Sequence, residues 1–332
     1  MMRRYVDVVL TGVQSLTHLV YASSYLRHRL NTDDAIDGIR LFVAPTPELL
    51  AKFSEAEVRG LLPADERLTT IIVQPGTPWW RGLSVDCVLL SIGAPGTRAL
   101  TRLLRARRGR KPLVVVVDEG IGSYGNWRSR RAAYRRKGGR EPEVSLRAAA
   151  VAGANAVVPD VRWSLYRRTG GRWFVDPVVA AEFRLHLDDQ QLERPSVVYL
   201  TQPWVKLGVM TVPEHARHLA HLRAECERQG FAFGVRPHPL DDPDLYRDQW
   251  VMMKRSAAEF DRRIAQASLV IGGSSTALLN IRALHGSRVM RIGTPGLAGL
   301  DRTLSARQRS LLDAVLPPAV DVDQVRSMLA KG

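Results

Sequence analysis

KPLVVVVDEGIGSYGNW, residues 111–127, is the stretch of sequence that decides the fold. Its four successive valines predict a strand that is buried on both faces, which is typical of a parallel sheet covered by helices. The strand delivers Asp118 and Glu119 side by side, and Gly120 follows them. Packing gives no reason for two adjacent carboxylates at the end of a buried strand. This edge of the sheet is therefore a candidate functional site.

Similar short apolar runs alternate with stretches of helical period along the whole chain. A first series predicts strands at 6–10, 39–44, 68–73, 86–93, 112–118 and 156–161, with helices at 15–30, 47–62 and 97–110. After the polar segment 186–196, a second series predicts strands at 197–202, 231–239, 268–273 and 287–293, with helices at 213–230, 257–267 and 276–286. This alternation predicts an α/β fold with two Rossmann-like domains, residues 1–190 and 191–332, that face each other across a cleft.

The composition is that of a globular protein with an unusually basic surface. Hydrophobic residues make up 45% of the 332 residues, and the net charge is +15. A basic surface favours anionic partners, such as nucleotides, acidic glycans or anionic lipid head groups. The two cysteines, Cys87 and Cys226, fit a reducing compartment and argue against a disulfide framework or a zinc site. No apolar window is long enough to span a bilayer and no signal peptide is evident, so we expect a cytoplasmic protein that can rest on the inner face of the membrane.

Two further motifs also follow predicted strands, so they lie at the carboxyl ends of strands, as the acidic pair does. Prolines on both sides of His238 fix its backbone, and a histidine held in this way can protonate or hydrogen-bond a leaving phosphate. The alternative is a loop histidine between turn-forming prolines. The run GGSST at 272–276 combines glycines with hydroxyl residues at a helix start, which predicts an anion cradle or, more simply, a helix cap. The residues expected to bind the phosphate of a nucleotide-activated donor substrate are His238, Pro239, Gly273, Ser274, Ser275 and Thr276.

The acidic pair can supply a general base, because neighbouring carboxylates push their pKa values apart and leave one of them ready to accept a proton. The alternative is that one carboxylate caps the next turn and the other pairs with an arginine. Residues 128–140, RSRRAAYRRKGGR, follow directly and predict a basic lane for an anionic acceptor, or else a solvated loop or a lipid contact. Trp79 and Trp80 could line the same cleft or pack in the core. The acceptor-side candidates in this region are Tyr124, Arg128, Arg130 and Arg131.

Taken in order, these motifs resemble the bacterial sialyltransferases and polysialyltransferases of GT-B fold. That family shares an acidic pair followed by glycine, a His-Pro motif and a later pair of serines. The corresponding residues here are Asp118-Glu119-Gly120, His238-Pro239 and Ser274-Ser275. The segment 11–22 also resembles the first strand and helix of the family, which adds Gln14 to the acceptor-side candidates.

The resemblance implies an inverting, metal-independent glycosyltransferase with no cofactor. It would move sialic acid, or a related nonulosonic acid, from a CMP-activated donor to a glycan hydroxyl during capsule or cell-surface polysaccharide synthesis. One of Asp118 and Glu119 would be the base, with Glu119 favoured, while His238 and the pair Ser274-Ser275 would contact the phosphate of the departing CMP.

Three alternatives remain open at this point. The first is a transferase that uses CDP-glycerol or CDP-ribitol, and the second is an epimerase that acts on a UDP-sugar. The third is a basic nucleic-acid-binding protein, although no helix-turn-helix, zinc-finger spacing or RNP-type strand is present and specific nucleic-acid binding is not expected.

Overall fold

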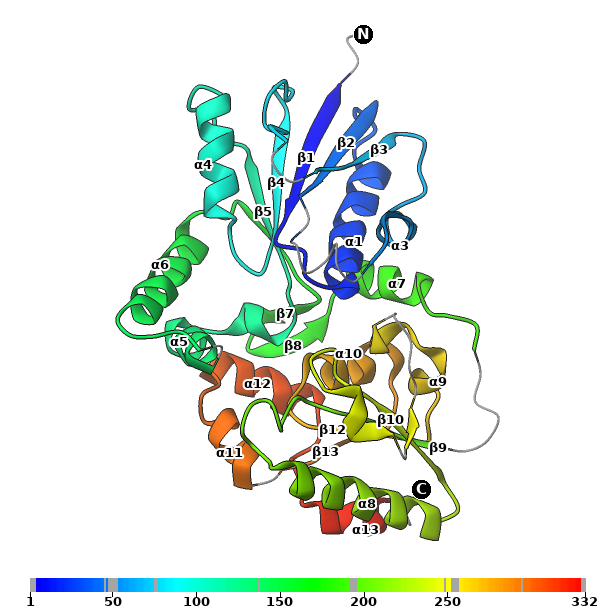
Figure 1. Ribbon diagram of the computed structural model, residues 1–332. Helices are drawn as coiled ribbons and strands as arrows, with labels where there is room; N and C mark the ends of the chain where they lie inside the picture. Colours follow the sequence, from blue (N-terminus) through cyan, green and yellow to red (C-terminus); the bar gives the residue numbers. More distant parts are fainter. Residues whose placement is uncertain are drawn as a thin grey trace. The chain divides into compact units, whose positions relative to one another are not determined.

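The computed structural model describes residues 4–44, 46, 53–74, 77–136, 138–190, 196–247, 249–251, 257–293 and 295–329. The chain divides into two compact units. Unit 1 consists of Met1–Arg131 with Gly139–His186, and unit 2 consists of Ala132–Gly138 with Leu187–Gly332. Each unit is built on a parallel sheet flanked by helices (Figure 1), which confirms the predicted α/β class.

Unit 1 contains a sheet of six parallel strands. The strands are β1 (Tyr5–Thr11), β2 (Gly38–Ala44), β3 (Leu68–Ile72), β4 (Cys87–Ile92), β5 (Leu113–Val117) and β6 (Val161–Trp163). Their spatial order, β3-β2-β1-β4-β5-β6, reverses direction between β1 and β4. Ligands of doubly wound sheets bind beyond the carboxyl ends of the strands at such a reversal.

Helices accompany these strands up to residue 185, and a two-stranded antiparallel sheet follows β6. They are α1 (Leu16–Thr32), α3 (Glu55–Gly60), α4 (Thr97–Ala106), η1 (Ile121–Tyr124), α5 (Trp127–Arg136), α6 (Glu143–Val157) and α7 (Pro177–Leu185). The added strands are β7 (Tyr166–Thr169) and β8 (Arg172–Val175). Helix α4 covers one face of the large sheet, where Leu103 packs with Val9 and Leu89.

Two sequence predictions for this unit need correction or restriction. The strand expected at 156–161 is wrong: the alanine-rich segment before it continues α6 to Val157, because alanine is the strongest helix former, and β6 begins only at Val161. The helix expected at 47–62 appears as the shorter α3, which Ser54 caps, while residues 47–52 lie outside the described residues.

Unit 2 contains five parallel strands in the order β11-β10-β9-β12-β13, with the same kind of reversal between β9 and β12. The strands are β9 (Ser196–Leu200), β10 (Ala232–Arg236), β11 (Trp250–Val251), β12 (Leu269–Gly272) and β13 (Val289–Arg291). The helices are α8 (Val212–Arg228), η2 (Pro243–Tyr246), η3 (Ala258–Phe260), α9 (Arg262–Ala265), α10 (Thr276–His285), α11 (Pro295–Asp301), α12 (Ala306–Val315), η4 (Val322–Gln324) and α13 (Val325–Leu329).

The central strand of unit 2 is buried on both faces, and helix α8 packs against β10 and α13. The helix expected at 257–267 is instead split into η3 and α9, because the Asp261 carboxylate accepts a hydrogen bond from the Arg263 amide and starts a new helix there. Within the described residues, none of the helices combines the length and the hydropathy that a transmembrane segment needs.

Candidate functional site

The two adjacent carboxylates of unit 1 turn in different directions at the end of β5. Asp118 is buried, with 3% of its surface exposed. Its Oδ2 accepts hydrogen bonds from the Tyr124 hydroxyl at 2.6 Å and from the Leu165 amide at 3.0 Å. Asp118 thus ties the end of β5 to η1 and to the segment after β6, and these bonds make it an internal anchor.

Burial raises the pKa of Asp118 to about 7, although the hydrogen bonds from Tyr124, Leu165 and Ser123 act in the opposite direction. The pKa of Asp118 in the folded protein lies above the unfolded value of 3.8. The contribution of Asp118 to the free energy of unfolding is therefore fully present at low pH and is lost as the pH rises towards 7. At physiological pH a part of the molecules therefore carries a buried charge at this position that the hydrogen bonds stabilise only in part.

The Asp118→Asn variant should remove this cost, since the amide oxygen can still accept the bonds from Tyr124 and Leu165. We expect its free energy of unfolding, relative to the original protein, to rise between about pH 4 and pH 7 by at most about 1.4 kcal/mol per unit, and then to level off. Urea unfolding of both proteins across this range measures the difference. A difference that is independent of pH would show that Asp118 titrates normally.

Glu119, in contrast, is half-buried, with 34% of its side chain exposed, and two glycines form a cradle for its carboxylate. A Cβ atom on Gly93, at the end of β4, would overlap Oε2, and a Cβ on Gly122 would lie 2.5 Å from Oε1. Gly93 also has a φ of +72°, which disfavours any side chain there. The absence of two side chains therefore creates the space that the Glu119 carboxylate occupies.

The backbone and charge of Glu119 are also fixed. Its amide donates to Ser123 Oγ at 2.9 Å, and Arg130 Nη1 lies 3.8 Å from its Oε1. The ring of His18 hydrogen-bonds the Glu119 backbone, while Nδ1 of His18 accepts from the Gln14 amide at 3.2 Å. Burial lowers the pKa of His18 to about 4, so the ring is neutral at physiological pH. Glu119 is thus a partly exposed carboxylate held at the reversal between β1 and β4.

The acceptor-side candidates fall in different places. Arg130, whose side chain is 10% exposed, lies next to the Glu119 carboxylate, and exposed Gln14 contacts His18 through its backbone amide. Arg131 bonds Glu141 at 2.7 Å, and exposed Arg128 lies 5.7 Å from the Trp127 ring centroid. Tyr124 does not lie on an acceptor surface as expected: only 5% of it is exposed, because its hydroxyl holds Asp118 in the interior.

Of the basic stretch 128–140, for which a basic lane, a solvated loop or a lipid contact was expected, residues 128–136 belong to helix α5 and so do not form a loop. Trp79 and Trp80 pack together at 5.4 Å between ring centroids and lie against the apolar face under α4. The core alternative therefore describes these two tryptophans, although both remain partly exposed.

The candidate site of unit 2 follows from the register of its sheet. Leu200 of β9 pairs with Arg236 of β10 and with Gly272 of β12. The residues two positions further along these strands are Gln202 after β9, His238 after β10 and Ser274 after β12. Since the strands are parallel, these three residues emerge at one edge of the sheet, at the reversal between β9 and β12.

His238 is held by its own loop. Its amide donates to Thr201 Oγ1 at 2.7 Å, and its Nδ1 accepts from the Leu240 amide at 3.1 Å. Asp241 braces the loop by accepting from the hydroxyls of Thr201 at 2.6 Å and Tyr246 at 2.7 Å. Because Nδ1 accepts this hydrogen bond, the neutral ring carries its proton on Nε2.

The serine pair divides its tasks at the start of α10. Ser275 is the N-cap, and its hydroxyl accepts from the Leu278 amide at 3.2 Å, as the simpler alternative expected. The Ser274 hydroxyl donates to Asp301 Oδ2 at 3.2 Å. Thr276 is the first residue of α10, so the helix N-terminus, which is the positive end of the helix dipole, follows Gly273 closely in the sequence. Pro239 is exposed next to His238.

Gln202 is a polar residue of this edge that the sequence analysis missed. Its Oε1 accepts from Nε1 of the buried Trp204 at 3.0 Å, and an indole nitrogen can only donate, so the amide orientation is fixed. A Cβ on Gly273 would lie 2.6 Å from the same Oε1. The side-chain NH₂ of Gln202 has no hydrogen-bond acceptor among the residues that the structure describes. The sequence signal that could have identified Gln202 is its position just after a fully buried strand.

Within the described ranges, no group of three or more histidine, cysteine, aspartate or glutamate side chains is arranged to hold a metal ion. The polar features of the two sheet edges are therefore a cradled carboxylate in unit 1, and an amide, a histidine and a helix N-terminus in unit 2.

No protein-family model matches the chain, and no curated protein matches its sequence. Solved structures do match it. A UDP-N-acetylglucosamine 2-epimerase superposes with a TM-score of 0.53 at 11% identity, over 99% of this chain and 87% of that chain. The glycotransferase of kitacinnamycin gives 0.53 at 13% identity, over 100% and 91%. The UDP-GlcNAc 2-epimerase from Neisseria meningitidis, bound to UDP-GlcNAc, gives 0.52 at 12% identity, over 99% and 91%.

At these identities the likeness shows the fold, and the fold is GT-B, with two Rossmann-like domains. The α/β fold with two Rossmann-like domains, as expected from the sequence, is thus confirmed. None of the three structures carries the name of a sialyltransferase.

Proposed function

We propose that this protein is an inverting glycosyltransferase whose general base is Glu119. The observation that carries the proposal is the cradle formed by Gly93 and Gly122, which holds a partly exposed carboxylate at the carboxyl edge of the unit 1 sheet. A general base has to reach the acceptor proton in a fixed geometry, and such a cradle supplies this constraint. Asp118 is the less suitable base, because its side chain is buried and hydrogen-bonded within the protein.

Unit 2 would bind the phosphate of the activated donor. The positive end of α10, the Gln202 amide and the Nε2 proton of His238 all stand at one edge of the sheet and suit an anion. In the reaction, Glu119 takes the proton of an acceptor hydroxyl, whose oxygen attacks the anomeric carbon of the donor. The bond from that carbon to the phosphate oxygen breaks, and the donors of unit 2 stabilise the charge on the departing phosphate. With these donors in place, the proposed mechanism uses neither a metal nor a cofactor.

The proposed donor is a CMP-activated sialic acid or related nonulosonic acid. Support comes from the order and chemistry of the three motifs, Asp118-Glu119-Gly120, His238-Pro239 and Ser274-Ser275, in which this chain resembles the bacterial sialyltransferases. The net charge of +15 supports an anionic glycan acceptor and contact with an anionic membrane surface on the cytoplasmic side. Capsule or other cell-surface polysaccharide synthesis would be the setting.

Epimerisation of a UDP-sugar is the second candidate, because two of the structures that share the fold are UDP-GlcNAc 2-epimerases. A thermal-shift screen with CMP, CDP, UDP, GDP and NAD at fixed salt separates the candidates. We expect selective stabilisation by CMP, and transfer from CMP-sialic acid when a glycan acceptor is added. Stabilisation by UDP alone, with turnover of a UDP-sugar in the absence of acceptor, would establish the epimerase. Selective stabilisation by CDP would indicate the polyol-phosphate transferase.

The Gln202→Glu variant should bind the nucleotide about 10 to 100 times more weakly, because a donor to the phosphate becomes a negative charge while the size of the side chain is kept. Gln202→Met, which lacks the donor but adds no charge, should show a smaller loss. Titration calorimetry with CMP measures both variants. If Gln202→Glu binds CMP as well as the original protein does, Gln202 takes no part in the phosphate site.

A further inference from the structure

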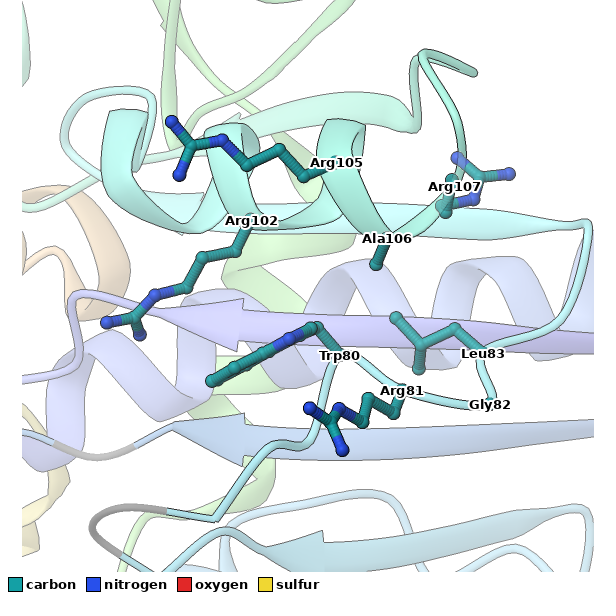
Figure 2. A pocket seen from close by; sticks show the side chains of 8 residues that line it. All are labelled: Trp80, Arg81, Gly82, Leu83, Arg102, Arg105, Ala106 and Arg107. Carbon is teal, nitrogen blue, oxygen red and sulfur yellow. The ribbon is translucent and has the colours of Figure 1, made fainter.

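A separate cavity of about 670 Å³ opens in unit 1 between α4 and residues 80–83. Figure 2 shows its lining, in which the indole of Trp80 lies between the side chains of Arg102 and Arg81. Arg105 and Arg107, from the last turn of α4 and the residue after it, complete its basic side. The lining contains four arginines and not one acidic residue.

The cavity lies away from the Glu119 edge. Residues 80–83 precede β4, and Arg105 stands at the end of the helix that follows β4. Since α4 runs back along the sheet after β4, its last turn points to the amino ends of the strands, whereas Glu119 follows the carboxyl end of β5. The cavity is therefore distinct from both candidate sites described above.

Trp80 gives the cavity a rigid floor. It packs with Trp79 against the apolar face of the sheet beneath α4. The Arg102 guanidinium stacks over its ring, with 5.0 Å between Cζ and the centroid. Stacking of this kind restricts the guanidinium but leaves its in-plane N–H donors available to an anion, so Arg102 is oriented before any ligand arrives.

The charge of the cavity is not compensated by the protein. Arg81, Arg102 and Arg105 form no ion pair within the described part of the chain, whereas other arginines of unit 1, such as Arg27 with Glu182, do. Asp7 accepts from the Ser84 amide nearby, but Arg40 already binds both of its oxygens. The charges of these guanidiniums are therefore available to an anionic ligand, which would pair with them in the cavity.

We propose that this cavity binds a phosphate group at the edge of the Trp80 indole, where Arg81 and Arg102 reach it from the two sides of the ring. A carboxylate is satisfied by one bidentate arginine, while a phosphate monoester offers three oxygens and can engage two guanidiniums at once. The ligand is thus a phosphorylated molecule, either free in solution or a phospholipid head group. The proposal does not depend on the function proposed for the Glu119 edge.

Titration with inorganic phosphate tests the proposal on three forms of the full chain: the original protein, Arg81→Ala/Arg102→Ala, and Arg98→Ala/Arg110→Ala. The last variant loses the same charge from exposed arginines that do not line the cavity. We expect the cavity variant to bind phosphate at least about tenfold more weakly than the other two forms. Because the unit 2 edge is identical in all three proteins, the difference reports on the cavity alone.

Sedimentation with vesicles of phosphatidylcholine, with and without phosphatidic acid, separates the two sources of phosphate. Loss of binding to phosphatidic acid in the cavity variant alone indicates a head group, and unchanged vesicle binding together with weaker phosphate binding indicates a soluble ligand. Equal phosphate and vesicle binding by all three proteins, or an equal loss in the charge-matched variant, would overturn the proposal.

Discussion

Replacement of Glu119 by glutamine should slow sugar transfer by about 10²–10⁴-fold, the range that a general base contributes, with little change in nucleotide affinity. Glutamine has the same shape as glutamate, so the cradle of Gly93 and Gly122 remains filled. What is lost is the charge that accepts the proton of the acceptor hydroxyl. Initial rates with a CMP-sialic acid donor, together with a titration of CMP, measure the two quantities separately.

Two further variants make this experiment specific. Asp118→Asn should keep most of the turnover, because its role is to accept internal hydrogen bonds. Gly122→Ala should lower turnover although the base is present, since its Cβ would displace the Glu119 carboxylate. Gly153→Ala is the matched control, because a Cβ there meets nothing within 4 Å. An active Glu119→Gln enzyme together with an inactive Asp118→Asn enzyme would instead assign the base to Asp118.

The fold was predictable because its strands are buried on both faces. The valines of β5 leave at most a few per cent of their surface to solvent, and a run of valines this long is typical of a strand covered by helices on both sides. The error at 156–161 arose where the sequence holds both signals: Val157 and Val158 favour a strand, but the alanines before them favour a helix. Local composition could not decide between the two.

The positions of the candidate site were also predictable, since parallel strands bring their carboxyl ends to one edge. The different environments of Asp118 and Glu119 were not, because they depend on partners far away in sequence. Leu165, 47 residues further along, supplies one of the hydrogen bonds to Asp118, and Gly93 makes room for Glu119. Gln202 was missed for a similar reason: its importance lies in the register of three strands, and no short motif marks it.

Replacement of His238 by alanine should lower turnover by about 10²–10³-fold, the cost of removing one donor to a developing negative charge. The Michaelis constant for the acceptor should change little, because the expected partner of His238 is the phosphate of the leaving nucleotide. The Leu240 amide fixes Nδ1 as an acceptor, which directs the Nε2 proton to this task. Steady-state rates at varied acceptor concentration measure both constants.

The decisive control is the supporting loop. Thr201→Val removes the hydroxyl that accepts from the His238 amide and donates to Asp241, but it keeps the imidazole. If the ring acts on the leaving group, free imidazole should restore part of the rate of His238→Ala and should have no effect on Thr201→Val, whose own imidazole is only misplaced. If His238 merely shapes the loop, both variants should fall by similar factors and neither should respond to imidazole. Rescue thus separates a proton donor from a structural residue, because only a missing donor can be replaced from solution.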